Sequence, residues 1–310
     1  MKILFMGTPD FALFSLKAIS DSDHEIVGVV TQPDKPKGRG YTLTPPPVKV
    51  FALEKGYNVY QPDTLRDDAF AQLLTELAPD VIVVVAYGKI LPLNVLEFPR
   101  YGCINVHGSL LPEYRGAAPM QRAIIDGKKQ TGITTMYMAQ GLDTGDMLLK
   151  DVVDIEENDN FETIHDKLGE CGASLILKTL TALEDGSAQR EVQDESLATY
   201  AAKITKETCA IDFDTDAPCV HDLIRGLSPI PLSFTHTPDG KLLKIISSRL
   251  TAKDGVHGKA GEVISLDSGI TVACKSGAVT LTRVIPEGKS RMDASDFIRG
   301  RKIAVGDVLS

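Results

Sequence analysis

Two polar residues lie within the apolar segment Cys103-Ile104-Asn105-Val106-His107. If this segment is a strand, Asn105 and His107 are two residues apart and point to the same face. An amide donor beside an imidazole, which titrates near neutrality, suits acyl transfer. In that chemistry one donor stabilises an oxyanion and the other group handles a proton. Asn105 and His107 are therefore candidate catalytic residues; the alternative is a structural polar pair at a strand end.

A carboxylate that could orient the imidazole lies further along the chain. Asp143 is bracketed by Gly141 and Gly145 in a predicted tight loop, where glycine permits unusual backbone angles and close approach of a ligand. A carboxylate there could hold His107 and stabilise its protonated form, although a Gly-Asp loop alone is usually a turn.

The sequence lacks the motifs that mark metal sites, serine nucleophiles and nucleotide-binding loops. The six histidines are dispersed without metal-ligand spacing, and the sequence has no GxSxG, no GxGxxG after the first strand and no GxxxxGK[ST].

The first half of the chain alternates short apolar runs with amphipathic stretches. The predicted strands are Lys2–Gly7, Glu25–Gln32, Asn58–Gln61, Asp80–Tyr87 and Cys103–His107. The predicted helices are Asp10–Ser20, Val48–Lys55, Asp67–Leu77 and a short one near Leu93. This order is typical of a doubly wound α/β domain with a mostly parallel sheet. Sites in such sheets form at the carboxyl ends of the strands, so the loops after Gly7, Gln32, Tyr87 and His107 are the expected functional ones.

The rest of the chain predicts a second, smaller domain. Two more strands are expected at Gly132–Ala139 and Met147–Ile155, followed by a long helix over Asp159–Glu184 with a capping box of Asp159 and Glu162. Residues from about 185 to 204 are polar and small, as in a linker. After a helix at Ala217–Gly226, glycine-containing turn signals separate short strand-like runs, which favours an OB-like β-barrel. We expect a catalytic domain over 1–204, linker included, and a second domain over 205–310.

Charge is distributed unevenly. The 310 residues (33.5 kDa) carry a formal net charge of −9, which argues against a nucleic-acid partner at first sight. Residues 1–204 have 19 basic and 29 acidic side chains, whereas residues 205–310 have 14 and 13. The proline-rich segment 33–47 carries Lys35, Lys37 and Arg39 against the single acid Asp34. Net charge is therefore a weak guide to partners. Five scattered cysteines without a CxxC pair suggest reduced thiols and a cytoplasmic protein.

Several of these segments together resemble one enzyme family. Residues 105–119 (NVHGSLLPEYRGAAP), the loop Gly141–Gly145, the N-terminal KILFMGTPDFA and the loop TQPDKPKGRG are similar to the 10-formyltetrahydrofolate-dependent formyltransferases. The resemblance extends over essentially the whole chain. It implies a Rossmann-like catalytic domain and a smaller OB-like domain. Within the family, the chain most resembles the members that act on initiator methionyl-tRNA. One departure is Ile230 in the segment PIPL, where the family often has an aromatic residue; this chain has no tryptophan.

The resemblance implies roles for individual residues. The catalytic trio of the family falls on Asn105, His107 and Asp143. The folate co-substrate, 10-formyltetrahydrofolate, would be bound partly by the backbone of Ser109, Leu110, Leu111 and Pro112. Further pocket residues are expected by position at Tyr87, Gly88, Ile90, Leu91, Gln140 and Leu142, and the alternative for these side chains is ordinary core packing. No metal is implied.

The implied reaction is attack of the α-amino group of tRNA-bound methionine on the formyl carbon. Asn105 and protonated His107 would hold the oxyanion, while Asp143 would hold His107 and assist proton movement. The loop with Lys35, Lys37 and Arg39 follows the second strand, so it is expected on the active-site side, where it would bind phosphates of the tRNA acceptor end.

We expect a monomer. The alternatives are a sugar-nucleotide N-formyltransferase, a 10-formyltetrahydrofolate hydrolase, a glycinamide ribonucleotide transformylase, which usually lacks the second domain, or a non-catalytic RNA-binding protein.

Overall fold

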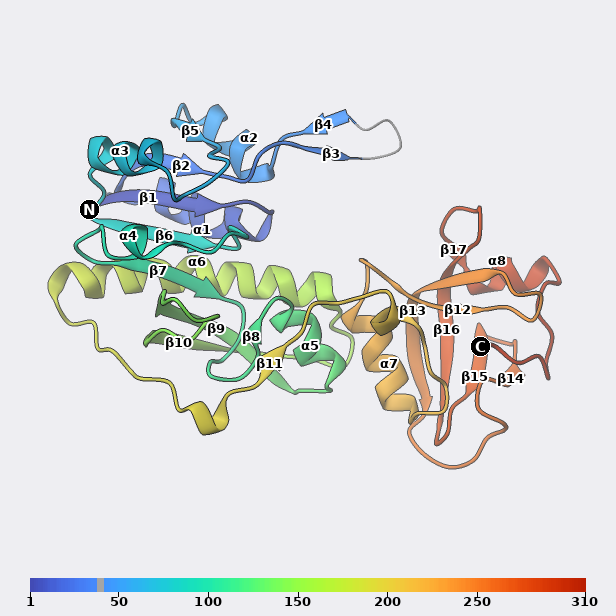
Figure 1. The fold of residues 1–310 in the computed structure, drawn as a ribbon. Helices are drawn as coiled ribbons and strands as arrows, with labels where there is room; N and C mark the ends of the chain where they lie inside the picture. Colours follow the sequence, from blue (N-terminus) through green and yellow to red (C-terminus); the bar gives the residue numbers. More distant parts are fainter. Residues whose placement is uncertain (38–41) are drawn as a thin grey trace. The chain divides into compact units, whose positions relative to one another are not determined.

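A computed structural model describes residues 1–37 and 42–310 of the chain. It consists of two compact units whose sequences are interleaved (Figure 1). The N-terminal unit comprises Met1–Gly116, Thr131–Val153 and His165–Tyr200. The C-terminal unit comprises Ala117–Gln130, Asp154–Ile164 and Ala201–Ser310. The division into domains over 1–204 and 205–310 stays a prediction, but two segments from within residues 1–204 pack with the last third.

The N-terminal unit is built on a seven-stranded sheet with the order β10-β9-β7-β6-β1-β2-β5. The strands are β1 (Lys2–Gly7), β2 (Glu25–Val30), β5 (Val59–Tyr60), β6 (Val81–Val85), β7 (Cys103–His107), β9 (Gln130–Tyr137) and β10 (Met147–Asp154). β1, β2, β5, β6 and β7 pair in parallel, whereas β9 pairs with β7 antiparallel. After β1 the chain builds outward through β2 and β5 and then returns to the other side of β1 with β6. The strand order therefore reverses between β1 and β6, where ligands bind in open α/β sheets.

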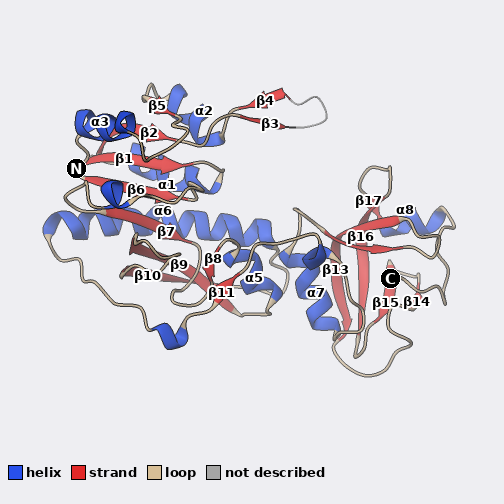
Figure 2. Ribbon diagram, in the orientation of Figure 1, coloured by secondary structure: helices blue, strands red, loops and turns tan. Residues whose placement is uncertain are grey.

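Helices cover both faces of this sheet (Figure 2). They are α1 (Phe11–Ser20), α2 (Pro47–Glu54), α3 (Asp68–Leu77), α4 (Leu93–Leu96) and α6 (Phe161–Asp185). Every residue of β6 is buried, which explains its continuous valine-rich run. α3 and α4 share a core with alternate residues of β1 and β6 such as Leu4 and Ile82. On the opposite face, Gly172 of α6 lies close to Val106 of β7.

Helix α6 begins within two residues of its predicted start, but its capping differs from the prediction. The side chain of Asn160 accepts the Thr163 N–H at 2.9 Å, and the Thr163 hydroxyl accepts the Asn160 N–H at 3.0 Å. This is the reciprocal arrangement of a capping box, moved one residue along from Asp159 and Glu162. Asp159 is engaged elsewhere, because its carboxylate accepts the Glu156 N–H and the Thr163 hydroxyl.

The C-terminal unit is an antiparallel sheet packed around one core. Its strands are β12 (Ser233–His236), β13 (Leu242–Ala252), β14 (Val263–Ser265), β15 (Ile270–Ala273), β16 (Ala278–Pro286) and β17 (Met292–Asp293). The order is β12-β13-β16-β15-β14, and β17 also pairs with β16. Helices α7 (Ala217–Gly226) and α8 (Ala294–Arg299) contribute Ile224 and Phe297 to this core, and α5 (Pro119–Ile125) belongs to the same unit. The predicted fold class, a Rossmann-like sheet followed by a smaller OB-like β-domain, is confirmed.

Short elements that the sequence analysis did not predict complete the chain. They are β3 (Lys35–Lys37) and β4 (Thr42–Thr44), which form a hairpin, β8 (Arg115–Gly116) and β11 (Tyr200–Ala201), which pair with each other, and the 3-10 helices at Glu195–Leu197 and Glu207–Cys209. The hairpin lies in the proline-rich segment, where no two-residue turn motif signalled it. Among the described helices, none has the length and apolar character needed to cross a membrane.

Candidate active site

Strand β7 presents the two polar residues that the sequence analysis singled out. Because Val106 lies against α6, Asn105 and His107 point to the other face of the sheet. β7 is flanked on both sides, with Asn105 opposite Val84 of β6 and His107 opposite Thr134 of β9. Asn105 is half-buried and His107 is buried. The pair is therefore held on a strand whose backbone is fixed from both sides.

The two ring nitrogens of His107 face different acceptors. Nε2 lies 3.0 Å from the carbonyl oxygen of Tyr114, and because a carbonyl only accepts, Nε2 carries the hydrogen in this bond. Nδ1 lies 3.8 Å from Oδ1 of Asp143, an ion-pair distance that is too long for a direct hydrogen bond. The three predicted catalytic side chains thus come from β7 and the loop after β9, and Asp143 is brought to the imidazole as expected from the resemblance.

Asp143 is fixed through its side chain and its main chain. Oδ2 accepts the Gly116 N–H at 2.8 Å, and the Asp143 carbonyl accepts a hydrogen bond from the Gln193 amide at 2.8 Å. Its backbone lies in the left-handed region at φ 52°, which is uncommon for a residue with a side chain. Gly145 is required for steric reasons, since a Cβ there would lie 1.8 Å from the Tyr137 carbonyl oxygen. The bracketing glycine therefore has a defined structural purpose.

The segment Ser109–Pro112, expected to bind folate through its backbone, is held by buried hydrogen bonds. The Ser109 hydroxyl donates to the Glu113 carbonyl at 2.7 Å. Thr134 Oγ1 donates to the Ser109 carbonyl at 2.8 Å and accepts the Leu111 N–H at 3.1 Å. Leu111 packs in a core cluster, whereas Leu110 and Pro112 are half-buried. The backbone conformation of this segment is therefore determined by β9, the strand next to His107.

The other expected folate-pocket residues divide into two groups. Tyr87 and Leu91 are buried in the core cluster shared with α3 and α4. The Tyr87 hydroxyl has no hydrogen-bond partner within the described part of the chain, and burial raises the pKa of Tyr87 to about 12. By contrast, Ile90 and Leu142 are 77% and 63% exposed, and Gly88 and Gln140 are exposed as well. Only the second group has side-chain or backbone surface that a ligand could reach directly.

The main-chain carbonyl of Tyr87 nevertheless helps to hold the surrounding loops in place. Its carbonyl accepts hydrogen bonds from the Thr8 hydroxyl at 3.1 Å and from the Gln32 amide at 3.2 Å. These bonds tie together the loops that follow β1, β2 and β6, at the position where the strand order reverses. The hydroxyl of Thr8 and the amide of Gln32 were not singled out from the sequence, because nothing local marks a long-range bond to a carbonyl.

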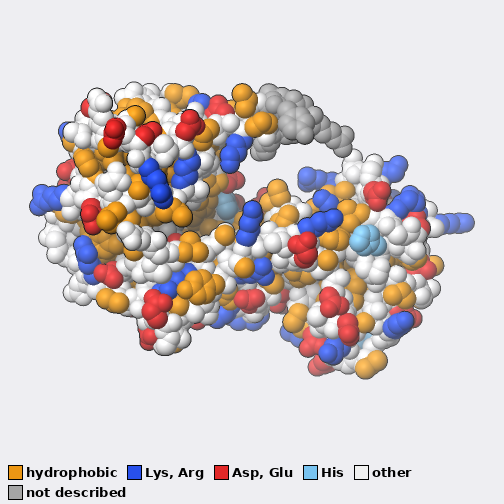
Figure 3. Space-filling model, viewed as in Figure 1, with side chains coloured by type: hydrophobic (Ala, Val, Ile, Leu, Met, Phe, Trp, Pro, Cys, Tyr) orange, Lys and Arg blue, Asp and Glu red, His pale blue; other side chains and the backbone are white. Residues whose placement is uncertain are grey.

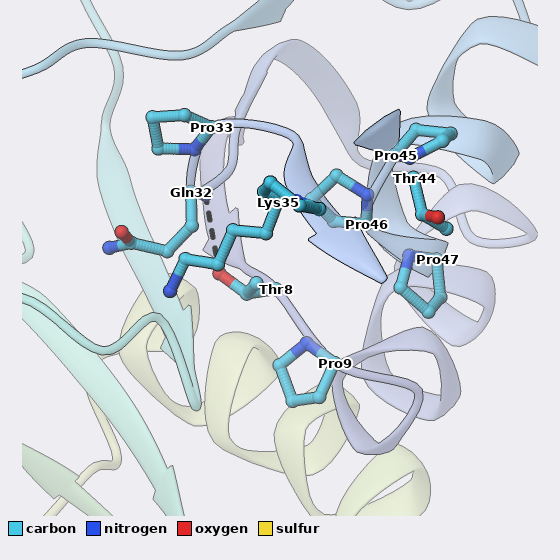
Figure 4. Close-up of a pocket in the computed structure, with 10 residues that line it drawn as sticks. Thr8, Pro9, Gln32, Pro33, Lys35, Thr44, Pro45, Pro46 and Pro47 are labelled. Carbon is cyan, nitrogen blue, oxygen red and sulfur yellow. Dashed lines mark hydrogen bonds between the residues drawn. The ribbon is translucent and has the colours of Figure 1, made fainter. Parts of the chain in front are cut away.

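The proline-rich segment forms one wall of a hollow of about 220 Å³ near the ends of β1 and β2 (Figure 4). Its lining is mainly proline rings, with a few polar side chains: Thr8, Pro9, Gln32, Pro33, Lys35, Pro36, Thr44, Pro45, Pro46 and Pro47. The carboxylate of Asp34 accepts from Lys49 at 2.9 Å and from Gln61 at 2.8 Å, and these contacts lower the pKa of Asp34. The single acid of this segment is thus neutralised locally, whereas Lys35 is exposed.

The remaining predicted tRNA-binding residues are only partly described. Lys37 is the last residue of β3, and Arg39 lies outside the described residues. In the C-terminal unit, basic side chains gather near β17 and α8 (Figure 3). Residues 287–302 contain five basic and three acidic residues, and the basic ones are exposed: Lys289, Arg291, Arg299, Arg301 and Lys302. Within residues 1–37 and 42–310, no group of three or more His, Cys, Asp or Glu could hold a metal ion.

Sequence comparison assigns the chain to a family. Residues 1–180 match the formyl transferase family, and residues 203–302 match the formyl transferase C-terminal domain. The chain therefore belongs to the formyl transferase family, as the resemblance predicted. Relatives of this chain carry the name methionyl-tRNA formyltransferase. The one from Desulforamulus reducens is 47% identical over 310 residues, which cover 100% of this chain and 98% of the relative. The one from Geotalea daltonii is 47% identical over 307 residues, covering 99% and 97%.

Solved structures of more distant proteins share the fold. The sugar 3N-formyl transferase WlaRD, solved with dTDP and 5-N-formyl-THF, aligns with a TM-score of 0.66 and 18% identity, covering 94% of this chain and 99% of that one. HypX from Aquifex aeolicus, solved with tetrahydrofolic acid, aligns with a TM-score of 0.63 and 18% identity, covering 97% of this chain and 47% of that one. Identities this low establish a common fold and nothing about the acceptor.

Proposed function

We propose that this chain transfers the formyl group of 10-formyltetrahydrofolate to the α-amino group of methionine on initiator methionyl-tRNA, for translation initiation. The observation that carries the proposal is the 47% identity to methionyl-tRNA formyltransferases, which runs through both units of the chain. The expected location is the cytoplasm and the expected state is a monomer. Residues 1–204 would perform the chemistry and residues 205–310 would bind tRNA.

The proposed chemistry assigns one task to each polar side chain. When the amine attacks the formyl carbon, the carbonyl oxygen becomes an oxyanion, which the Asn105 amide and the protonated His107 ring stabilise. The carbonyl of Tyr114 at Nε2 and the carboxylate of Asp143 near Nδ1 are both acceptors, and together they hold the ring in its orientation beside Asn105. In the proposed step Asp143 assists the proton that leaves the amine nitrogen as the new bond to carbon forms. The tetrahedral intermediate then collapses: the bond between the formyl carbon and the folate nitrogen breaks, that nitrogen takes up a proton, and tetrahydrofolate is released while formyl-methionine remains on the tRNA.

The expected pocket residues suit a folate. Ile90 and Leu142 are large apolar side chains exposed to water on the loops after β6 and β9. Such side chains suit the flat ring system of a pterin, while the fixed backbone of Ser109–Pro112 offers polar groups. In this proposal Gly88 and Gln140 complete the pocket, and Tyr87 and Leu91 support it from the core.

The acceptor end of the tRNA is proposed to bind along the proline-rich segment. Lys35, Lys37 and Arg39 supply positive charge for phosphates, and the prolines limit the chain entropy that is lost on binding. Lys35 is exposed, and its acidic neighbour Asp34 is already paired with Lys49. The exposed basic side chains near β17 and α8 are the proposed contact for the body of the tRNA.

One assay with three acceptors tests the proposal. The chain is incubated with 10-formyltetrahydrofolate and, in separate reactions, initiator methionyl-tRNA, a nucleotide-linked amino sugar, or water alone. We expect formyl-methionyl-tRNA as the product and no formylated sugar. Formylation of the sugar, or release of formate in the absence of an acceptor, would instead support one of the alternative enzymes.

A further inference from the structure

The amide of Gln193 links the two loops of the candidate active site. Its nitrogen donates to the carbonyl oxygens of Asp143 and Gly145, both at 2.8 Å. Its oxygen accepts the Nε–H of Arg115 at 2.9 Å. Gln193 is only 5% exposed. Both amide hydrogens and the amide oxygen therefore have partners inside the protein.

Arg115 fixes the orientation of this amide. Its side chain is fully buried, and its two terminal nitrogens donate to the two carboxylate oxygens of Glu195 at 2.9 and 2.8 Å. Because the guanidinium donates and never accepts, it selects the amide orientation with the oxygen of Gln193 towards Arg115 and the nitrogen towards the loop of Asp143. The Arg115 N–H donates to the Thr199 carbonyl at 2.9 Å, which holds the backbone in place as well.

The network acts on the residue that the proposed chemistry places beside His107. Asp143 has φ 52°, a conformation that its own side chain disfavours and that other contacts must maintain. Gly116, the residue after Arg115, holds the carboxylate of Asp143, while Gln193 holds the carbonyl. Arg115 and Gly116 therefore hold Asp143 at two places. Gly116 binds its carboxylate directly, and Arg115 acts on its carbonyl through Gln193.

We infer that Gln193 is a positioning residue that keeps the carboxylate of Asp143 at its distance from His107, and that Arg115 orients Gln193 for this purpose. The inference rests on the proposed function. Gln193 does not touch the reacting atoms; it acts through Asp143. A loop displaced by about 1 Å costs on the order of 10²-fold in rate, so loss of the amide donors affects kcat more than the binding of either substrate.

The informative substitution is Gln193→Glu, which keeps the size and the acceptor for Arg115 but removes both donors. We expect kcat to fall by roughly 10- to 100-fold while KM for tRNA and for folate stays within about twofold. Gln189→Glu is the matched control, because it makes the same chemical change four residues earlier on an exposed side chain. The control is expected to keep wild-type kinetics.

The decisive measurement repeats Gln193→Glu in an Asp143→Asn background. If Gln193 acts through the carboxylate of Asp143, the second substitution lowers kcat by less than about threefold there, because the group that it positions is already absent. A merely structural role would give the same loss in both backgrounds and would overturn the inference. Unchanged kcat in the single variant would overturn it as well.

Two further measurements separate the possible failures. If Gln193→Glu does not fold, as judged from its unfolding transition, the same experiment is done with Glu195→Gln. Glu195 is 70% exposed, so this substitution weakens the ion pair that holds Arg115 without altering the packing of the core. The same criterion then applies: a kcat loss that disappears with Asp143→Asn supports the inference, and equal or absent losses contradict it. If the wild-type chain forms no formyl-methionyl-tRNA, the proposed function fails, whatever the variants do.

Discussion

At the scale of single residues, the candidate site is defined by what surrounds His107. Its buried ring lies between a carbonyl oxygen and a carboxylate. Asn105 lies on the same face of β7 and is more exposed than the ring. The Asn105 amide can donate to a developing oxyanion, and His107, beside it on the same rigid strand, is held by these two acceptors.

Replacement of Asn105 tests its role as an oxyanion donor. We expect Asn105→Ala to lower kcat by roughly 10²- to 10³-fold, the usual effect of removing one such donor, with a small change in KM. Initial rates of formyl transfer to initiator methionyl-tRNA measure this. Asn158→Ala, on an exposed loop residue, is the matched control. Turnover close to wild type in Asn105→Ala would exclude the assigned role.

Replacement of Asp143 tests the support of the imidazole. Asp143→Asn keeps an acceptor for the Gly116 N–H and removes the negative charge 3.8 Å from the ring. We expect kcat to drop by about 10²-fold and the pH–rate profile of kcat to change shape, because the carboxylate that is proposed to assist proton movement is gone. The profile is recorded with both substrates saturating. An unchanged rate together with an unchanged profile would contradict the orienting role.

At the scale of elements, His165 of α6 joins this helix to the start of α1. Nε2 of His165 lies 3.6 Å from Oδ1 of Asp10, the residue that caps α1. Hydrogen bonding to Asp10 and then to Asp166 raises the pKa of His165 above 6.5, although burial opposes this, and His165 in turn lowers the pKa of Asp10 below 3.8. The rings of Phe11 and Phe14 pack edge-on against His165. The loop after β1 is thereby anchored to the longest helix.

From this pair we expect the stability of the fold to depend on pH. The stabilisation that His165 contributes is fully present below pH 6.5 and is lost as the pH rises through its folded pKa. The stabilisation that Asp10 contributes is present above pH 3.8 and is lost as the pH falls through its folded pKa. Asp10→Asn keeps a cap acceptor but removes the charge. We therefore expect it to lower the unfolding midpoint at about pH 5.5 and to have little effect at about pH 8.5.

Thermal unfolding at the two pH values checks this prediction. Asp63→Asn, on an exposed carboxylate, controls for a general change of net charge. An equal shift of the midpoint at both pH values would mean that Asp10 stabilises the fold only through its cap.

At the scale of the whole molecule, positive charge is concentrated in a few places. The net charge of −9 conceals a near-neutral last third and a basic proline-rich segment. Asp34, the neighbour of Lys35 in the sequence, is paired with Lys49 and so does not neutralise Lys35. Lys35 itself lines the hollow that is walled mainly by prolines. An acidic protein can therefore present phosphates with a few concentrated basic positions.

Salt dependence tests this arrangement. We expect Lys35→Ala to raise KM for tRNA by up to about fivefold, the equivalent of an exposed ion pair worth about 1 kcal/mol. The slope of log affinity against log salt should become shallower by about 0.7 to 0.9, because the variant neutralises one phosphate fewer. KM for folate should not change. Lys178→Ala, an exposed lysine on α6, is the control. Affinity that is independent of salt in the wild type would exclude a phosphate-dominated interface.

Much of the fold followed from local pattern. The apolar runs of β1 and β7 and the helix α7 have the predicted bounds, because a strand buried on both faces and an amphipathic helix both leave a periodic record in neighbouring residues. The hairpin of β3 and β4, the pairing of β8 with β11 and the helix α5 were not predicted. Short elements of this kind are stabilised by distant partners rather than by their own composition.

The sequence by itself determined the residue types for acyl transfer, their place at the end of one strand and the family to which the chain belongs. Spacing within a strand fixes which side chains share a face, and that information is local. Only the tertiary structure decided which other groups hold these side chains and the loop of Asp143: the Tyr114 carbonyl at His107, the Gly116 N–H at Asp143, and Gln193 oriented by Arg115. These bonds join residues up to 78 positions apart. Their geometry depends on how loops fold back over the sheet, which no local periodicity encodes.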